Sequence, residues 1–284
     1  MVTHVITSPI HQPHTIRDRA LFDAIANNDT LSVAEIAQFN RVGWVGPYAL
    51  LSPFGLQQIQ LAYERVAPNL LRDNLIAHRA NQDAFDLNPW FKSLHAHERV
   101  FCDVAAHPAI VKRVTSILGP DVIVWGVAVV IRQPGQVHRW HVDVEHKRWP
   151  GVTAFIGISN ICRDSTLNVI SGSQGIDVTP QELRLRDDGE ALSAAQSRLA
   201  NCTRDAIIMR DGEFAVFDGP LWHGSNNTSD KLRIAVTAQY CRPNAETRIP
   251  LNWDDPIEWH DYRPPCVLVN GEDRYRVNRL VEWE

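Results

Sequence analysis

Short runs of apolar residues recur through the second half of the chain and predict β-strands. Residues 122–131 are almost all apolar and rich in β-branched side chains, which is typical of a buried strand, and Pro134-Gly135 then predicts a turn. The same short apolar or alternating pattern returns at residues 152–158, 206–210, 213–217 and 233–240. Asp211-Gly212 predicts a hairpin turn between two of these strands. Strands at this spacing favour a barrel or a sandwich, and we expect a barrel, which gathers side chains from distant strands around one interior.

The first part of the chain has the longer spacing of apolar residues that predicts helices. Ser32 and Glu35 form the pattern of a capping box, so a helix begins at residue 33 and runs through Phe39. Further helices are predicted at residues 56–66, 97–105 and 108–118. The last of them has Pro108 in its first turn and Gly119 as its stop. We expect these helices to pack against one face of the barrel.

The chain of 284 residues is predicted to form one domain, because barrels with flanking helices often reach this length and no linker divides it. The helical part spans about 16–118, the barrel core about 121–243 and a C-terminal segment about 244–284. The C-terminal segment, with Trp253, Trp259 and Trp283, is either an irregular cap or a subunit contact. The polar residues 181–200 predict a helix, which is either a solvated face or a lid at the barrel mouth.

Composition and charge favour small-molecule chemistry. The net charge of −5 and the isoelectric point near 6.2 leave no broad basic surface to attract nucleic acid or anionic lipid. The five cysteines are an odd number without a CxxC pair, so neither a disulfide framework nor a zinc knuckle is predicted. No segment has the pattern of a signal peptide or a bilayer span. We therefore expect a cytoplasmic protein that binds neither nucleic acid nor membrane.

A histidine and an aspartate stand two residues apart in His141-Val142-Asp143, within a segment that is predicted to be a strand. Side chains of a strand alternate between its faces, so both can reach one metal ion while Val142 packs on the other side. The later segment Trp222-His223-Gly224-Ser225 offers a third ligand. Two imidazoles and one carboxylate on one face leave the opposite positions open, as in non-heme Fe(II) oxygenases. The sequence therefore predicts an iron site of His141, Asp143 and His223.

Arg233 is a charged residue in an otherwise apolar strand, residues 232–236, where an unpaired charge is costly to bury. A carboxylate that accepts two parallel hydrogen bonds from the guanidinium resolves that conflict. We expect this carboxylate to belong to a co-substrate. Ser225, two residues after His223, is either a second hydrogen-bond donor to the same carboxylate or a turn residue.

Other side chains near the predicted ligands are candidate substrate contacts. The candidates by sequence proximity are Trp140, Trp149, Trp222, Arg139, Glu145 and Arg148. The three tryptophans either line a substrate cavity or pack in the core. His138 stands three residues before His141, so on a regular strand it faces away from the metal, and His146 lies beyond the end of that strand. We expect neither of these two histidines to bind the metal.

The chain resembles the phytanoyl-CoA dioxygenase family of Fe(II)- and 2-oxoglutarate-dependent oxygenases over most of its length. Residues 31–44 resemble the opening helix and following strand of the family, and residues 50–53 resemble the next helix entry. His141-Val142-Asp143 and residues 223–233 resemble the metal and co-substrate segments. Residues 168–174 resemble a Pro-Gly-Ser-His loop of the family, with Ser171 in place of the proline and Gln174 in place of the histidine.

The resemblance implies a mainly β fold with flanking helices, a double-stranded β-helix of the jelly-roll, cupin-like kind. It implies that His141, Asp143 and His223 bind Fe(II), and that Arg233 meets the C5 carboxylate of the co-substrate 2-oxoglutarate. Hydroxylation of a small molecule by dioxygen is the expected reaction. Related halogenases have Gly or Ala where Asp143 stands here, so halogenation is disfavoured.

The residues do not specify the substrate. An amino acid or a natural-product intermediate is our preferred class, which would place the enzyme in secondary metabolism as a monomer or homodimer. An acyl-thioester hydroxylase is the alternative within the enzyme class, although no basic groove for the phosphates of coenzyme A is evident. A catalytically silent barrel that binds a metal or ligand is the alternative from another class. The intact ligand set and Arg233 argue against a silent barrel.

Overall fold

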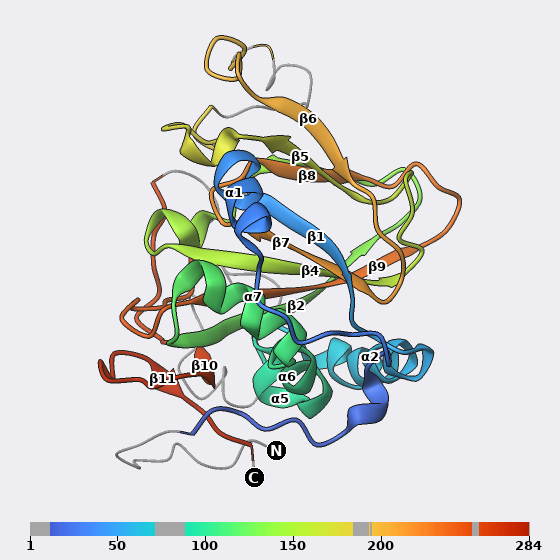
Figure 1. The fold of residues 1–284 in the computed structure, drawn as a ribbon, viewed down its shortest axis with the longest axis vertical. Helices are drawn as coiled ribbons and strands as arrows, with labels where there is room; N and C mark the ends of the chain where they lie inside the picture. The colour runs from blue at the N-terminus through green and yellow to red at the C-terminus, as the bar shows by residue number, and fades with distance from the viewer. Residues whose placement is uncertain (1–11, 72–88, 184–192, 194, 252–255, 284) are drawn as a thin grey trace.

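The fold is built on two β-sheets that lie one above the other (Figure 1), as seen in a computed structural model that describes residues 12–71, 89–183, 193, 195–251 and 256–283. The larger sheet has the strand order β1-β7-β4-β9-β2-β10-β11, and the smaller one has the order β3-β8-β5-β6. Neighbouring strands are antiparallel except β10 and β11. The strands are β1 (Trp44–Ala49), β2 (Val122–Arg132), β3 (Val137–His141), β4 (Gly151–Ser159), β5 (Leu167–Ser171), β6 (Thr203–Ile207), β7 (Glu213–Asp218), β8 (His223–Asn226), β9 (Arg233–Cys241), β10 (Pro265–Asn270) and β11 (Arg279–Leu280).

Helices cover the outer face of the larger sheet (Figure 1). The α-helices are α1 (Val33–Val42), α2 (Pro53–Val66), α5 (Leu94–His97), α6 (Arg99–Ala105) and α7 (Pro108–Leu118), and single 3-10 turns are η1 (Arg19–Leu21), η2 (Ala67–Asn69), η3 (Val144–Lys147) and η4 (Ser173–Gly175). Apolar residues of α2, α6 and α7 form one buried cluster with the residues of β2, β4 and β9 that face the helices. Tyr240 on β9 also donates a hydrogen bond of 2.8 Å from its hydroxyl to the carbonyl oxygen of Ala105 on α6. The helices therefore hold the larger sheet from outside and leave its inner face to the site.

A second apolar cluster fills part of the space between the two sheets. It joins Phe155 of β4 and Phe217 of β7 in the larger sheet to Val169 of β5 in the smaller one. This arrangement is the jelly roll that was expected, with mainly β structure and helices on one face. Two stacked sheets with a partly filled interior leave room for a cavity whose walls come from strands distant in sequence.

The sequence patterns predicted most helix positions. Ser32 caps α1, with its hydroxyl oxygen accepting a bond of 3.3 Å from the Glu35 N–H, while the Glu35 carboxylate accepts one of 2.8 Å from the Ser32 N–H. Gly119 ends α7 with φ of +95°, a value that favours glycine. The helix predicted at 97–105 is interrupted, because Glu98 is extended and separates α5 from α6.

Two predictions about the strands were wrong. A turn does form at Asp211-Gly212, where the Glu213 N–H donates a bond of 3.1 Å to the Arg210 carbonyl oxygen. It does not close a hairpin, because β6 and β7 belong to different sheets and the chain crosses between them. The strand predicted at 206–210 lies earlier, at 203–207, where it pairs with β5.

The larger sheet reaches beyond the predicted barrel bounds of 121–243 at both ends of the chain. Strand β1 comes from the N-terminal part and pairs with β7, and β10 comes from the C-terminal segment and pairs with β2. The C-terminal segment is thus partly an integral strand of the sheet. The described residues within 181–200 form mainly turns, and the rest of that segment, like Trp253, lies outside the described residues.

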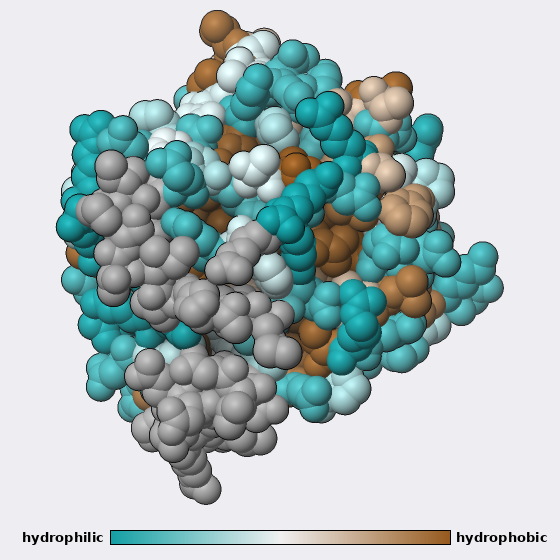
Figure 2. Space-filling model, turned by 90° about the horizontal axis from the view of Figure 1, so that it is seen from below, coloured by the Kyte–Doolittle hydropathy of each residue, from teal (hydrophilic) through white to brown (hydrophobic). Residues whose placement is uncertain are grey.

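The visible surface in Figure 2 is mostly hydrophilic, with apolar residues in separate small groups. Within the described ranges, none of the helices combines the length and the apolar character needed to cross a membrane.

We expect Ser32→Ala to lower the free energy of unfolding by about 1 kcal/mol, because it removes one partner of the capping box at the start of α1. Urea denaturation followed by far-UV circular dichroism measures the change. Thr30→Ala, at an exposed position just before the helix, is the control and should change the unfolding free energy by less than about 0.5 kcal/mol. Equal stability of Ser32→Ala and the parent chain would contradict the role of the capping box.

Candidate active site

The pairing of β3 with β8 places two histidines directly opposite each other. His141, the last residue of β3, is the cross-strand partner of His223, the first residue of β8, and their ring centroids lie 4.1 Å apart. Gly224 is needed beside them, because a Cβ atom there would lie 2.9 Å from the carbonyl oxygen of His138. The glycine therefore lets the two strands approach closely enough for the histidines to share one site.

Both imidazoles are held by backbone carbonyl groups. The Nδ1 atom of His141 lies 2.8 Å from the carbonyl oxygen of Arg139, and the Nδ1 atom of His223 lies 2.8 Å from that of Leu221. A carbonyl oxygen only accepts hydrogen bonds, so each Nδ1 carries a proton, and a neutral ring in this arrangement presents the lone pair of Nε2. This is the tautomer that a metal ligand needs, and the carbonyl contacts also fix the ring orientation.

Asp143 completes the group two residues after His141. It follows the end of β3, and its backbone is still extended, with φ of −66° and ψ of 100°. The Thr153 hydroxyl on β4 donates a hydrogen bond of 2.6 Å to Oδ2 of Asp143, while Oδ1 lies 3.8 Å from Nε2 of His223. One ligand atom from each of the three residues lies within 4.8 Å of the other two. One carboxylate oxygen of Asp143 is therefore held by Thr153, and the other faces the histidines.

The protonation states suit a divalent cation. Burial, together with the neighbouring His223, lowers the pKa of His141 to about 3, so its imidazole is neutral near pH 7. Burial alone would raise the pKa of Asp143, but the neighbouring His223 and Lys92 side chains hold it below its ordinary value, so the carboxylate is ionised. Neutral imidazole and ionised carboxylate are the forms that bind metal without first releasing a proton. The donor set thus fits a divalent transition metal.

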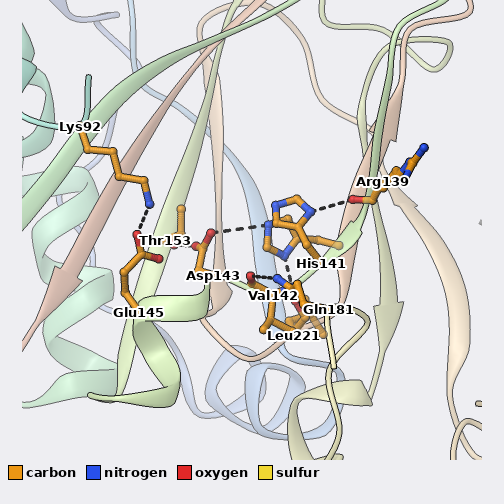
Figure 3. A network of polar contacts seen from close by, with 10 residues as sticks. Lys92, Arg139, His141, Val142, Asp143, Glu145, Thr153, Gln181 and Leu221 are labelled. Atoms are coloured by element: carbon orange, nitrogen blue, oxygen red, sulfur yellow. Dashed lines mark hydrogen bonds and ion pairs between the residues drawn. The ribbon is translucent and has the colours of Figure 1, made fainter. Parts of the chain in front are cut away.

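Val142 lies between the two ligands and is anchored on the opposite side, as predicted. Its side chain is buried in a small cluster with Trp140 and Trp222. The side-chain amide of Gln181 bonds both backbone groups of Val142, at 3.2 Å to its N–H and 2.7 Å to its carbonyl oxygen (Figure 3). Gln181 thus takes the place of a neighbouring strand where β3 has ended. The sequence analysis missed this role, because no local pattern links residues 142 and 181.

Arg233 is buried in the space between the sheets, with 1 % of its surface exposed. Its Nη2 donates a hydrogen bond of 3.2 Å to the Ser225 hydroxyl, and its Nε and Nη1 have no hydrogen-bond partner among the described residues. The guanidinium lies over the ring of Phe155, 5.6 Å from its centroid. A buried guanidinium with unsatisfied donors requires an acceptor, and a carboxylate has the matching geometry.

A second arginine stands beside Arg233. Arg132 at the end of β2 is the cross-strand partner of Arg233, and its Nε also lacks a partner among the described residues. Burial and the charge of Arg132 lower the pKa of Arg233 to about 10, which still leaves it charged near pH 7. The sequence analysis missed Arg132, although a second arginine at the end of a strand was a visible signal. Two adjacent cations make this end of the site a strong attractor for an anion.

These groups line one cavity of about 1040 Å³, at the upper end of the volumes usual for small-molecule sites. The walls include the metal-binding group, Arg233, Ser225 and two of the predicted substrate contacts, Trp140 and Arg139. Trp149 and Trp222 do not line it. Trp149 packs against Trp125, with ring centroids 5.4 Å apart, and Trp222 is buried behind Val142. The volume is large enough for a co-substrate and a second small molecule together.

The prediction that His138 faces away from the metal group was wrong. The pairing of β3 with β8 is irregular between His138 and His141, and such a bulge changes which face a side chain occupies. The rings of His138 and His141 therefore lie 4.1 Å apart, and His138 lines the cavity. His146, by contrast, is buried and does not belong to the group of His141, Asp143 and His223. Its Nδ1 lies 3.2 Å from the Trp149 carbonyl oxygen.

Of the charged candidates named by proximity, Glu145 lines the cavity, where it forms an ion pair with Lys92 (Figure 3). Arg148 does not line it, and its guanidinium lies 5.4 Å from the ring centroid of Trp259. Lys92 was missed, because it precedes the first described strand of the cavity by thirty residues and belongs to no motif.

The comparisons with known proteins agree with this geometry. The family model described as phytanoyl-CoA dioxygenase (PhyH) matches residues 39–235. No curated protein matches the chain in sequence.

Three solved structures illustrate the similarity in fold. CytC3 with Fe(II) and alpha-ketoglutarate is 17% identical, with a TM-score of 0.56, over 88% of this chain and 93% of that one. The non-heme monooxygenase ThoJ is 18% identical, with a TM-score of 0.54, over 87% and 86% of the two chains. The non-heme alpha-ketoglutarate-dependent carbocyclase SnoK from nogalamycin biosynthesis is 18% identical, with a TM-score of 0.52, over 76% and 86%.

We expect the chain to bind one divalent transition metal ion, and His223→Ala to weaken that binding by more than about 100-fold, because only two ligands would remain. Competition with a chromophoric chelator, using Co(II) as the probe, measures the affinity. His260→Ala, a histidine outside the cavity, should bind Co(II) as the parent chain does. Unchanged Co(II) affinity in His223→Ala would show that the ion binds elsewhere.

Proposed function

The chain belongs to the phytanoyl-CoA dioxygenase family of Fe(II)- and 2-oxoglutarate-dependent oxygenases, and from this premise we propose that it oxidises a C–H bond of a small molecule in the cavity described above. One observation carries the proposal: His141, Asp143 and His223 converge within 4.8 Å on the wall of a cavity that also contains a buried arginine, whose Nε and Nη1 find no hydrogen-bond partner among the described residues. The chain thus offers a metal-binding group and an anion-binding group to the same space.

The metal ligands of this proposal are His141, Asp143 and His223. The two histidines would bind through Nε2, since their Nδ1 atoms are occupied by backbone carbonyl groups. Asp143 would bind through the oxygen that Thr153 does not hold. Iron and 2-oxoglutarate, when bound, supply the oxidising power of the reaction with dioxygen, and 2-oxoglutarate is converted to succinate and carbon dioxide.

Arg233 and Ser225 are the proposed binding groups for the C5 carboxylate of 2-oxoglutarate. Arg233 has two nitrogen donors, Nε and Nη1, that meet no acceptor in the described part of the chain, and the Ser225 hydroxyl, which already accepts a bond from Arg233, has its own proton left to donate. Arg132 adds positive charge at the same end. Burial between the sheets excludes water from this contact, which strengthens it.

Hydroxylation is the outcome we propose. Asp143 fills the position that a halide would need, so halogenation is disfavoured. The proposed substrate is an amino acid or a natural-product intermediate, and the relation in fold to SnoK, described as an enzyme of nogalamycin biosynthesis, supports a role in secondary metabolism. We further propose a cytoplasmic enzyme that is a monomer or homodimer. A silent barrel is disfavoured, because burying the charge of Arg233 without a carboxylate partner would destabilise the fold and serve no binding function.

Arg233→Met should weaken 2-oxoglutarate binding by about 100-fold while Fe(II) still binds, because the substitution removes charge-assisted hydrogen bonds but no metal ligand. Arg233→Lys keeps the charge but lacks the planar pair of donors, so its affinity for 2-oxoglutarate should lie between that of the parent chain and that of Arg233→Met. Anaerobic titration of the weak visible charge-transfer band of the Fe(II) and 2-oxoglutarate complex measures both affinities. Arg274→Met, at an exposed position, is the control. Undiminished 2-oxoglutarate affinity in Arg233→Met would exclude the assigned role.

A screen of amino acids, natural-product intermediates and acyl thioesters for stimulated succinate release should identify the substrate class, with product mass as the second readout. Hydroxylation adds one oxygen atom to the substrate, whereas desaturation or ring closure removes a pair of hydrogen atoms. We expect addition of oxygen to an amino acid or natural-product intermediate. Stimulation by acyl thioesters alone would replace the proposed substrate class, and an Fe(II)-loaded chain that never consumes 2-oxoglutarate would support the silent barrel.

A further inference from the structure

A pair of opposite charges lies in the cavity on the side of Asp143 that faces away from His141 in the close-up view (Figure 3). Lys92 and Glu145 form an ion pair there, and the Lys92 ammonium lies 5.4 Å from the ring centroid of Trp125. The Glu145 side chain is fully buried. Lys92 is close enough to Asp143 to act on its charge, so the pair borders the metal-binding group.

Glu145 uses only one of its carboxylate oxygens in this pair. Its Oε1 accepts from Lys92, while its Oε2 is buried and has no hydrogen-bond partner among the described residues. A buried carboxylate oxygen without a donor is costly, and such atoms in folded proteins are nearly always satisfied by a neighbour or a ligand. Glu145 lines the cavity, so a molecule bound in the cavity can reach it.

A second unsatisfied acceptor lies nearby. Gln239 on β9 is 3 % exposed and lines the cavity, and its Oε1 also has no partner among the described residues. A Cβ atom on Gly126 would lie 3.0 Å from that oxygen and 3.8 Å from the Cβ of Lys92. The Gln239 amide and the base of the Lys92 side chain therefore both lie beside Gly126. We call Lys92, Glu145 and Gln239 the acceptor cluster, because it presents acceptors that lack donors.

The two ends of the cavity have opposite needs. At one end, Arg233 and Arg132 have N–H donors for which the described residues supply no acceptor. At the other, the acceptor cluster has two oxygens for which the same part of the chain supplies no donor. A carboxylate satisfies the first end and cannot satisfy the second. The acceptor cluster must therefore face a different chemical group from the one that the arginines face.

We propose that the acceptor cluster binds the protonated amine of the substrate, which makes the substrate a primary or secondary amine. The ammonium group of a primary or secondary amine carries at least two N–H donors, the number that the oxygens of Glu145 and Gln239 require. A charged N–H donor also makes a stronger hydrogen bond than a neutral one to Oε2 of Glu145, the oxygen that Lys92 does not engage. A hydroxyl group donates once and would leave one acceptor unsatisfied. Because the cluster borders Asp143, the oxidised C–H bond lies near the nitrogen. The inference rests on the proposed function and specifies its substrate class.

Matched probes test the charge preference of the acceptor cluster. Pentylamine, 1-pentanol and hexanoate form one set, and cyclohexylamine, cyclohexanol and cyclohexanecarboxylate form another. Saturation-transfer NMR measures their binding to the full chain without metal, and again with Zn(II) and 2-oxoglutarate. We expect each amine to bind at least tenfold more tightly than its alcohol or carboxylate. Equal binding of the alcohols would overturn the assignment to an amine.

Two variants connect this preference to the named residues. Glu145→Gln should remove the preference for amines, whereas Glu98→Gln, which alters an ion pair with Arg65 outside the cavity, should keep it. The double variant Lys92→Glu with Glu145→Lys retains an ion pair and should prefer carboxylates to amines. A folded double variant that keeps the parent preference would overturn the inference. Circular dichroism verifies folding, and the comparison of probes on the parent chain decides the question even if a variant unfolds.

The charge-transfer band separates this inference from the proposed function. A chain that shows the Fe(II) and 2-oxoglutarate band but no preference for amines refutes the acceptor cluster alone. A chain that prefers amines but lacks the band supports the acceptor cluster and refutes the proposed oxygenase. The two results are read from different experiments on the same protein.

Discussion

The cross-strand pairing of His141 with His223 is the contact on which the site depends. It joins segments eighty-two positions apart in the sequence, and it exists only because β3 and β8 lie in register at their ends. The same register lets the carbonyl groups of Arg139 and Leu221 fix both ring tautomers. A shift of one residue would turn one imidazole to the other face of the sheet and leave Asp143 with a single partner. The arrangement of the site therefore depends on the close approach of the strands at Gly224 and on the bulge in β3.

The residues that could be identified from the sequence belong to patterns formed by neighbours in the sequence. His141 and Asp143 are two positions apart, Arg233 is a charge within an apolar strand, and Ser32 with Glu35 forms a capping pattern within one helical turn. Such signals, together with the family resemblance, were enough to predict most helices, most strands and the jelly roll, and to name the three residues of the candidate metal site. The structure places these predicted ligands together in one site.

What the sequence did not reveal depends on contacts between distant segments. The bulge that returns His138 to the cavity is a property of two paired strands, and no alternation within 137–141 could indicate it. The turn at Asp211-Gly212 has the composition of a hairpin, yet the chain changes sheets there because β7 pairs with β1 and β4 instead. Strand β10 joins the sheet beside β2 although its segment has the irregular composition of a cap. Lys92 and Gln239 lie far apart in the sequence, and only the folded chain brings both to the cavity wall beside Gly126.

Gln181 fixes the backbone between His141 and Asp143 from outside the predicted ligand set. Where β3 ends, the amide of this side chain stands in for the peptide of a missing neighbour and grips both polar groups of Val142. The backbone between His141 and Asp143 is therefore tied to the segment that carries Gln181, and this segment also forms part of the cavity wall through Pro180 and Gln181. One amide side chain thus joins the residue between the two predicted metal ligands to the boundary of the space in which a small molecule would bind.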